Sequence, residues 1–291
     1  MQVATLAVDA VDLWRRLRSS ERAAGFYFLY VSALAAGLPL AGQTRLRIWG
    51  VNLLVGGLLA YLAQAPAKRL DWRDWLPAAL ILLAYKEMGW LAQPHYDINR
   101  ETAWVHWDRL VLGQWGVKAL IESAGPAIPG LLELCYLLVY LMVPVSIGLA
   151  TIYARDRVEQ LTFPLLVTCL LTYGLFPFFP SEPPRTVFPA DLVPAYQTLF
   201  RQINWYICGG YGIHTSVFPS GHVSSSIAAT VGVYRLMPER RWAWGALTLV
   251  AIGIFIATVY GRYHYLVDSL AGALVAALVL TTLPRAAGQE R

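Results

Sequence analysis

Eight separated apolar stretches constrain the fold of this chain more than any other feature. They are runs of non-polar residues with few charges, and they occupy residues 24–42, 46–64, 75–92, 129–153, 160–180, 222–237, 241–260 and 265–284. The hydrocarbon core of a bilayer is ~30 Å thick, and an α-helix crosses it in about 20 residues. We therefore predict an all-α, polytopic membrane helix bundle with about eight transmembrane helices. The short stretch 222–237 is expected to begin or end in protein rather than lipid.

Composition agrees with a membrane bundle and excludes several other classes of protein. Hydrophobic residues make up 57% of the 291 residues and charged residues only 14%, whereas globular proteins carry about 25% charged residues. No basic run has interleaved aromatic residues, so we expect no nucleic-acid partner. The three cysteines, Cys135, Cys169 and Cys208, are odd in number and lack the spacing of a zinc site, which argues against a disulfide framework.

The apolar stretches divide the chain into three parts. Residues 1–20 carry apolar side chains at roughly helical spacing and no cleavable signal peptide, which indicates an amphipathic helix on the membrane surface. That helix and three spans form an N-terminal unit, 1–92. Residues 93–128 form an outer interfacial connector, and 129–291 a five-span catalytic unit. Interfacial helices are expected in the outer loops, at 107–121 and within 181–221, where tryptophan and tyrosine recur.

The distribution of lysine and arginine predicts the orientation. With a cytoplasmic N-terminus, fourteen of the 23 basic residues fall on the inner side, eight on the outer side and one, Lys86, within a span; the positive-inside rule favours this arrangement. We predict an integral membrane protein, of the cell membrane if the source is prokaryotic, with both termini cytoplasmic. All five histidines then lie on the extracytoplasmic side. Ionisable residues within spans are functional candidates, and these are Lys86, Glu87, Glu133 and Asp268. The plainer alternatives are snorkelling for Lys86 and helix capping for Glu133.

A short motif opens the apolar stretch at 222. Pro219-Ser220-Gly221-His222 precedes that stretch, and a helix N-terminus presents free N–H groups and the positive end of the helix dipole to an anion. Ser220 suits the N-cap, and Gly221 lets a phosphate approach the backbone closely. His222, in the first turn, is expected to face the bound anion.

A second motif, His264-Tyr265-Leu266-Val267-Asp268, opens the last apolar stretch. His264 and Asp268 are four residues apart and share one helix face. Asp268 is expected to accept the Nδ1–H of His264, which leaves Nε2 free to attack phosphorus. Arg185 follows two prolines after a span, and its guanidinium suits a phosphate. A metal site would need further carboxylates at ligand spacing, so we predict neither a metal ion nor another cofactor.

The order Pro183-Pro184-Arg185, Pro219-Ser220-Gly221-His222 and His264-Tyr265-Leu266-Val267-Asp268 resembles the phosphatidic acid phosphatase type 2 superfamily over about residues 95–284. Within it, the chain looks most like the branch that contains fungal inositol phosphorylceramide synthase. The resemblance implies that His264 is the nucleophile, aided by Asp268, and that His222 is the general acid. It also implies that Arg185, Ser220 and Gly221 hold the phosphate, and that no metal takes part.

Two positions depart from the pattern of the wider superfamily. A lysine seven residues before the motif arginine is replaced by Phe178, and an arginine six residues before the nucleophilic histidine is replaced by Thr258. The branch with inositol phosphorylceramide synthase resembles this chain in lacking the second. Lost phosphate ligands must be replaced, and the candidates are Arg262 and Lys86.

These residues predict an enzyme of lipid metabolism that cleaves a phosphate ester of a phospholipid or lipid phosphate through a phosphohistidine. Transfer of the phosphoryl group to water would make it a lipid-phosphate phosphatase. Transfer to an alcohol, such as inositol or a ceramide-like lipid, would make it a head-group transferase, for example an inositolphosphotransferase, and the resemblance favours transfer. An alternative of another class is a non-catalytic transporter or scaffold. Against it, the sequence has no inverted repeat and no matched pair of broken helices.

Overall fold

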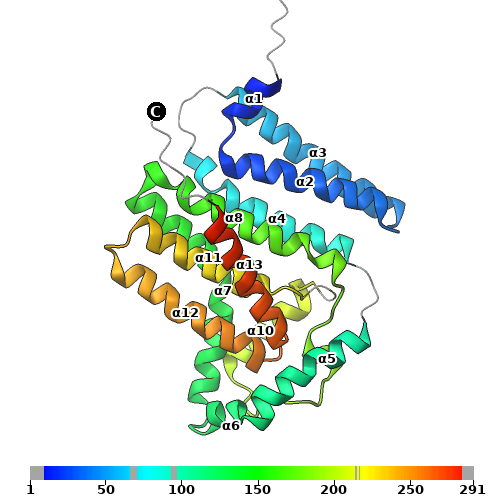
Figure 1. Ribbon diagram of the computed structural model, residues 1–291, viewed down its shortest axis with the longest axis vertical. Helices are drawn as coiled ribbons and strands as arrows, with labels where there is room; N and C mark the ends of the chain where they lie inside the picture. The colour runs from blue at the N-terminus through cyan, green and yellow to red at the C-terminus, as the bar shows by residue number, and fades with distance from the viewer. Residues whose placement is uncertain (1–9, 66–70, 93–96, 214, 216, 284–291) are drawn as a thin grey trace, which may run out of the picture.

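The computed structural model describes residues 10–65, 71–92, 97–213, 215 and 217–283. Over these residues the chain forms thirteen α-helices joined by short 3₁₀ and π turns, with no strand (Figure 1). The predicted all-α class is therefore confirmed. Residues 1–9, which hold the first half of the predicted amphipathic helix, lie outside the described residues, and α1 (Ala10–Arg16) is its described part.

A long helix covers most of each predicted apolar stretch. These helices are α2 (Ser19–Gly37), α3 (Gly42–Gln64), α4 (Leu76–Leu91), α7 (Ala127–Tyr153), α8 (Glu159–Gly174), α11 (Gly221–Leu236), α12 (Arg241–Tyr260) and α13 (Leu266–Thr282). Within the described residues, four segments are long and apolar enough to cross a membrane: Gly42–Gln64, Ala127–Tyr153, Glu159–Phe178 and Arg241–Tyr260. The chain thus has the character of a membrane protein, while the number of eight spans is not confirmed, because several of the other helices have only 16 or 17 residues.

Helix α11 lies at the centre of the bundle. It packs against α7, α8, α12 and α13, and most of its residues are buried. Small side chains make this possible, because they let neighbouring helices approach closely. At Gly232, a Cβ atom would lie 3.1 Å from Leu161 of α8. The short stretch 222–237 is therefore surrounded largely by protein, as its length suggests.

A polar network joins the N-terminal helices to the rest of the bundle at one end. Asp74 accepts hydrogen bonds from Arg18 at 2.8 Å and Arg155 at 3.2 Å, and Arg73 pairs with Glu21. These residues connect the start of α2, the 3₁₀ turn Asp71–Asp74 and the end of α7. Along the rest of their length, α2 and α4 pack against α8. The division into units 1–92, 93–128 and 129–291 stays a prediction.

Short helices gather at the opposite end of the bundle (Figure 1). They are α5 (Ile98–Asp108), the π turn Arg109–Gln114, α6 (Val117–Glu122), α9 (Pro184–Val187) and α10 (Leu199–Tyr211). The predicted helix at 107–121 is interrupted, because Gly116 adopts a left-handed conformation (φ 72°) between the π turn and α6. Trp205 and Tyr206 of α10 are exposed, as expected of a helix in the membrane interface. The first turns of α11 and α13 face this end.

Candidate active site

The two motifs found in the sequence meet at the N-termini of α11 and α13. Ser220 caps α11: its hydroxyl accepts a hydrogen bond from the Val223 N–H at 3.4 Å. Its own N–H donates to the Asp268 carbonyl at 2.9 Å. Gly272 allows this approach, because a Cβ atom there would lie 2.4 Å from the Ser220 carbonyl oxygen. Gly221 is equally constrained, since its Cβ would lie 2.8 Å from the Tyr173 ring.

His264 lies in the turn between α12 and α13, and a backbone carbonyl orients its ring. Nδ1 is 3.0 Å from the Val217 carbonyl oxygen. A carbonyl oxygen only accepts, so Nδ1 carries the proton and Nε2 carries the lone pair. The expected Nδ1–H bond to Asp268 is replaced by this one: the Asp268 carboxylate lies 3.4 Å from Nδ1. The reason is local, because the same Asp268 oxygen accepts the Tyr265 N–H at 2.9 Å and caps its own helix.

The surroundings keep His264 neutral. Burial is the largest cause, and together with the positive charge of Arg185 it lowers the pKa of His264 to about 3, against the opposing hydrogen bond to Val217. A neutral imidazole with a free Nε2 is the nucleophilic form.

His222 lies beside His264. The ring centroids of the two imidazoles are 5.4 Å apart. The His222 ring stacks on Tyr136 at 5.0 Å, and Tyr136 stacks in turn on Tyr263 at 3.8 Å. The two histidines thus share one small region that is lined by aromatic rings.

Arg185, at the start of α9, connects the first motif to the His264 turn. Its N–H donates to the Arg262 carbonyl at 3.3 Å, and its Nη1 donates to the Tyr263 carbonyl at 3.4 Å. Its guanidinium lies 5.5 Å from the centre of the Tyr263 ring. Because its charge contributes to the lowered pKa of His264, Arg185 is the arginine best placed for an anion at the histidines.

The structure brings seven of the eight predicted site residues into one contact network: Arg185, Ser220, Gly221, His222, Arg262, His264 and Asp268. Arg262 is buried and pairs with Asp108 at 2.8 Å. Lys86 lies on the exposed side of α4. The roles of Arg262 and Lys86 as replacement phosphate ligands stay predictions.

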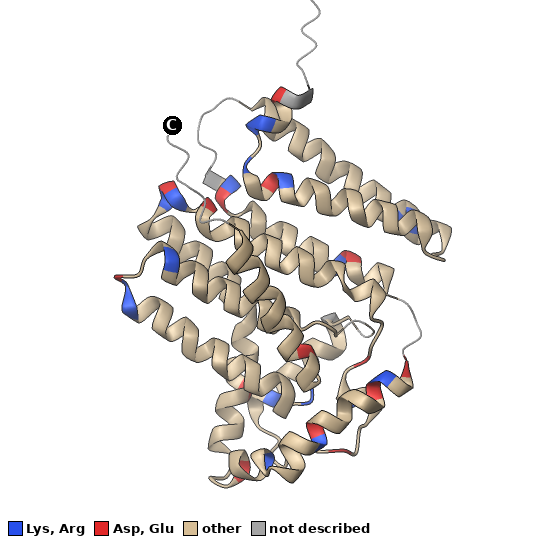
Figure 2. Ribbon diagram, in the orientation of Figure 1, with Lys and Arg blue, Asp and Glu red and all other residues tan. Residues whose placement is uncertain are grey.

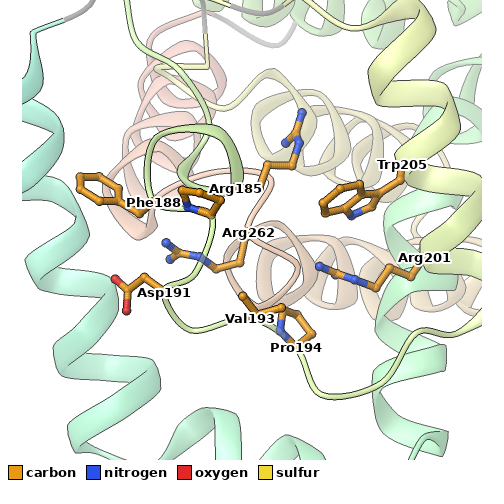
Figure 3. A pocket seen from close by; sticks show the side chains of 9 residues that line it. Arg185, Phe188, Asp191, Val193, Pro194, Arg201, Trp205 and Arg262 are labelled. Atoms are coloured by element: carbon orange, nitrogen blue, oxygen red, sulfur yellow. The ribbon is translucent and has the colours of Figure 1, made fainter.

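A small cavity of about 70 Å³ adjoins this network. Three arginines line it together with aromatic, proline and other residues: Arg185, Arg201, Arg262, Phe188, Pro189, Asp191, Val193, Pro194 and Trp205 (Figure 3). In Figure 3 the Arg185 side chain leads away from those of Arg201 and Arg262. Arg201 donates to Glu133 at 2.7 Å, and Arg262 pairs with Asp108. Both of these arginines therefore already have a carboxylate partner. The cavity adjoins the histidine site, and neither histidine lines it.

Several buried polar residues of this region lie outside the site predicted from the sequence. Glu133, a functional candidate for which helix capping was the plainer alternative, accepts from Arg201, from Asn204 and from the Tyr263 hydroxyl at 2.6 Å. Glu101 and Asp108 of α5 are fully buried against the motif segments. Glu101 and Asp108 are seven residues apart and so share one helix face, and this spacing was the feature of the sequence that could have indicated their burial. Among the described residues, no group of three or more His, Cys, Asp or Glu side chains is arranged to hold a metal ion, and metal-free chemistry stays a prediction.

The geometry defines a class of protein: a bundle of apolar, membrane-type helices with two neighbouring histidines at the starts of two of them. The sequence-family model of the PAP2 superfamily matches residues 102–282, more than half of the chain. The chain therefore belongs to that superfamily. A PA-phosphatase related-family protein of Dictyostelium discoideum is 49% identical over 55 residues, which are 19% of this chain and 9% of that protein. The match therefore spans less than a tenth of that relative. No solved structure matches the chain significantly.

Proposed function

We propose that this chain is an integral-membrane enzyme that cleaves a phosphate ester of a phospholipid or lipid phosphate through a phosphohistidine, and that transfer of the phosphoryl-bearing group to an alcohol is its main reaction. One observation carries the proposal. The Val217 carbonyl fixes the Nδ1–H tautomer of His264 at 3.0 Å, which leaves Nε2 as the nucleophile beside a second imidazole, His222.

In the first half of the reaction, the Nε2 lone pair of His264 attacks phosphorus in line with the ester oxygen. The N–P bond forms as the P–O bond to the lipid alcohol breaks. Burial and the neighbouring His264 and Arg185 also lower the pKa of His222, so its imidazolium depends on the negative charge of the bound phosphate. That imidazolium donates a proton to the departing alkoxide and becomes neutral. The positive charge that develops on the His264 ring is favoured by the Asp268 carboxylate, 3.4 Å from Nδ1, and by the Val217 carbonyl.

In the second half, the hydroxyl of an acceptor attacks the phosphohistidine. Neutral His222 takes the acceptor proton as the new O–P bond forms, and the N–P bond breaks to return the electron pair to Nε2 of His264. Both histidines thereby regain their starting protonation states, and no other reactant is needed.

The phosphate is bound by Arg185 and the start of α11. Arg185 supplies a charged donor beside the histidines, and the helix N-terminus capped by Ser220 supplies N–H groups and the positive end of the dipole. These groups stabilise negative charge on the phosphoryl oxygens in the transition state, which is the main protein contribution to phosphoryl transfer.

The surroundings of the histidines favour an alcohol over water as the acceptor. His264 is only 5% exposed, and the rings of Tyr136, Tyr140 and Tyr263 lie around the pair. A dry site slows hydrolysis of the intermediate, and its aromatic rings suit the apolar part of an acceptor such as a ceramide-like lipid or the ring face of inositol. The alternative within the same mechanism is a lipid-phosphate phosphatase, in which water takes the phosphoryl group from His264.

The test uses the purified full chain in detergent with labelled phospholipids and lipid phosphates, with and without acceptor alcohols. The control is His264→Ala. A new phospholipid that forms only with an acceptor supports transfer, and free phosphate without an acceptor supports hydrolysis. An acid-labile phosphorylated protein, absent from the variant, supports the phosphohistidine. Full turnover by His264→Ala would refute the mechanism.

A further inference from the structure

Helix α5, one of the short helices at this end of the bundle, presents two carboxyl groups to the site. The buried residues of α5 are Glu101, Val105 and Asp108, and positions i, i+4 and i+7 lie on one helix face. Glu101 and Asp108 are 0% exposed. A buried carboxyl is costly unless it is hydrogen-bonded, so the partners of these two groups indicate what they do.

Asp108 holds both ends of the turn that carries His264. Its Oδ2 accepts from Nη1 of Arg262 at 2.8 Å, and its Oδ1 accepts from the Leu266 N–H at 2.9 Å. His264 lies midway between these two residues in sequence. One carboxylate therefore fixes the start and the end of the turn relative to α5.

Glu101 and Trp104 connect the same turn to the other two motif segments. Glu101 accepts from the Tyr265 hydroxyl at 2.8 Å and from the Glu182 N–H, next to Pro183, at 2.8 Å. The Trp104 ring stacks on Phe218 at 5.0 Å and meets Tyr265 edge-on at 5.7 Å. Helix α5 thus contacts the segments that carry Arg185, His222 and His264.

Arg262 occupies a backbone position where glycine is the usual residue. The Tyr263 N–H donates to the Thr258 carbonyl at 3.0 Å and the Arg262 N–H to the Val259 carbonyl at 3.1 Å, which is the Schellman pattern at the end of α12. Arg262 is its left-handed residue, with φ 63°. An arginine there is unfavourable for the backbone, so the side chain and its pair with Asp108 must account for it.

We propose that Glu101 and Asp108 are positioning residues for the phosphoryl-transfer reaction: α5 fixes the His264 turn against α11, and Asp108 acts through Arg262. The inference rests on the proposed function for its kinetic readout. It also has a consequence that needs no turnover, because the hydrogen bond from His264 to Val217 depends on the position of the turn.

The experiment compares five variants of the full chain in detergent. Asp108→Asn and Glu101→Gln remove charge and keep shape and one acceptor oxygen. Arg262→Gly removes the guanidinium and supplies the residue that the backbone prefers. The double variant Asp108→Asn with Arg262→Gly avoids an unpaired buried carboxylate if Arg262→Gly alone fails to fold. The matched control is Asp97→Asn, since Asp97 is an exposed N-cap of the same helix and asparagine caps equally well.

We expect Asp108→Asn and Arg262→Gly each to lower kcat by about 10- to 100-fold with little change in KM, because a small displacement of a reacting group has effects of that size. The double variant should lose about as much as Asp108→Asn alone, and Asp97→Asn should stay within about twofold of the wild type. The inference is overturned if Asp108→Asn keeps wild-type kcat, or if the two losses multiply in the double variant.

A second measurement separates this inference from the proposed function. In protein labelled with ¹⁵N-histidine, the buried Nδ1–H of His264 should give a downfield proton signal that is absent from His264→Gln. We expect that signal to shift or disappear in Asp108→Asn and to stay unchanged in Asp97→Asn. If the wild type turns over no lipid substrate and the signal still behaves in this way, the proposed function fails and the positioning role stands. An unchanged signal in both Asp108→Asn and Glu101→Gln refutes the positioning role.

Discussion

At the scale of single residues, the two histidines differ in what surrounds them. His264 is held by a backbone carbonyl that fixes its tautomer, and burial keeps it neutral. His222 lies flat against Tyr136 in the first turn of α11. Burial lowers its pKa as well, so its imidazolium needs the negative charge of a bound phosphate. A neutral nucleophile and an anion-dependent proton donor are the two roles that the proposed reaction requires.

Replacing His222 should affect substrates according to their leaving groups. For His222→Asn we expect the rate with an alkyl phosphate ester to fall by about 10²- to 10⁴-fold, because general acid catalysis contributes that much. A p-nitrophenyl ester needs no proton on its leaving group, so its rate of phosphohistidine formation should fall far less. Initial rates and burst amplitudes with both esters measure this. Equal losses would contradict the role of general acid.

Glu101 makes the stability of the protein depend on pH. Burial raises its pKa from 4.5 to about 7, against the opposing hydrogen bonds from the Glu182 N–H and the Tyr265 hydroxyl. Between these two values the unfolded chain loses the proton before the folded one, so the stability contribution of this group falls as pH rises and is lost above about 7. We expect the difference in Tm between the wild type and Glu101→Gln to decrease from pH 4.5 to 7. A difference that rises with pH contradicts the assignment.

At the scale of helices, the site depends on how closely α13 approaches the start of α11. The Asp268 carbonyl accepts the Ser220 N–H at 2.9 Å, and one turn further along α13 Gly272 lies against the Ser220 carbonyl. A Cβ atom at Gly272 would lie 2.4 Å from that oxygen, a backbone atom that cannot move aside. The contact between the two motifs therefore requires glycine at this position.

Gly272→Ala should separate α13 from α11 and reduce both activity and stability. We expect a loss of about 1–3 kcal/mol in the free energy of unfolding, the usual cost of overpacking. Gly245→Ala in α12 is the matched control, since a Cβ there meets nothing within 4 Å, and alanine in a helix interior stabilises by roughly 0.5–1 kcal/mol. Denaturation in detergent with both variants measures this. Equal stability of the two would show that the helices separate without cost.

The helices and the motif residues were predictable, and the hydrogen bonds between them were not. Apolar runs predict helices directly, and the two motifs sit at helix starts as expected. The partner of Nδ1 on His264 is a backbone carbonyl of Val217, and backbone acceptors leave no mark in the sequence. Glu101 and Asp108 share a face with Val105, yet a polar interfacial helix normally turns its carboxylates to water. Only the packing of α5 on the motif segments shows that these two are buried.

At the scale of the whole molecule, charged residues gather at the two ends of the bundle (Figure 2). The network of Arg18, Asp74 and Arg155 brings the starts of α2 and α4 and the end of α7 to one end. Helix α5 lies at the other end (Figure 1), and it contacts the segment that carries His264. Segments separated by two or more helices thus return to the same side, which is the arrangement that spans crossing a membrane alternately would have.

The orientation that we predict in the membrane rests on the excess of basic residues on the side of the N-terminus, and it has a direct test. Single cysteines are placed in a Cys208→Ser background, in which the remaining cysteines, Cys135 and Cys169, are buried. One is Asp97→Cys beside the histidine end, and the other is Glu239→Cys in the turn between α11 and α12; both positions are exposed. We expect an impermeant maleimide to label Asp97→Cys in intact cells and Glu239→Cys only after permeabilisation. The reverse pattern would place the site on the cytoplasmic side, where it would act on lipids of the inner leaflet. Labelling of both positions in intact cells would show that the two positions do not lie on opposite sides of the membrane.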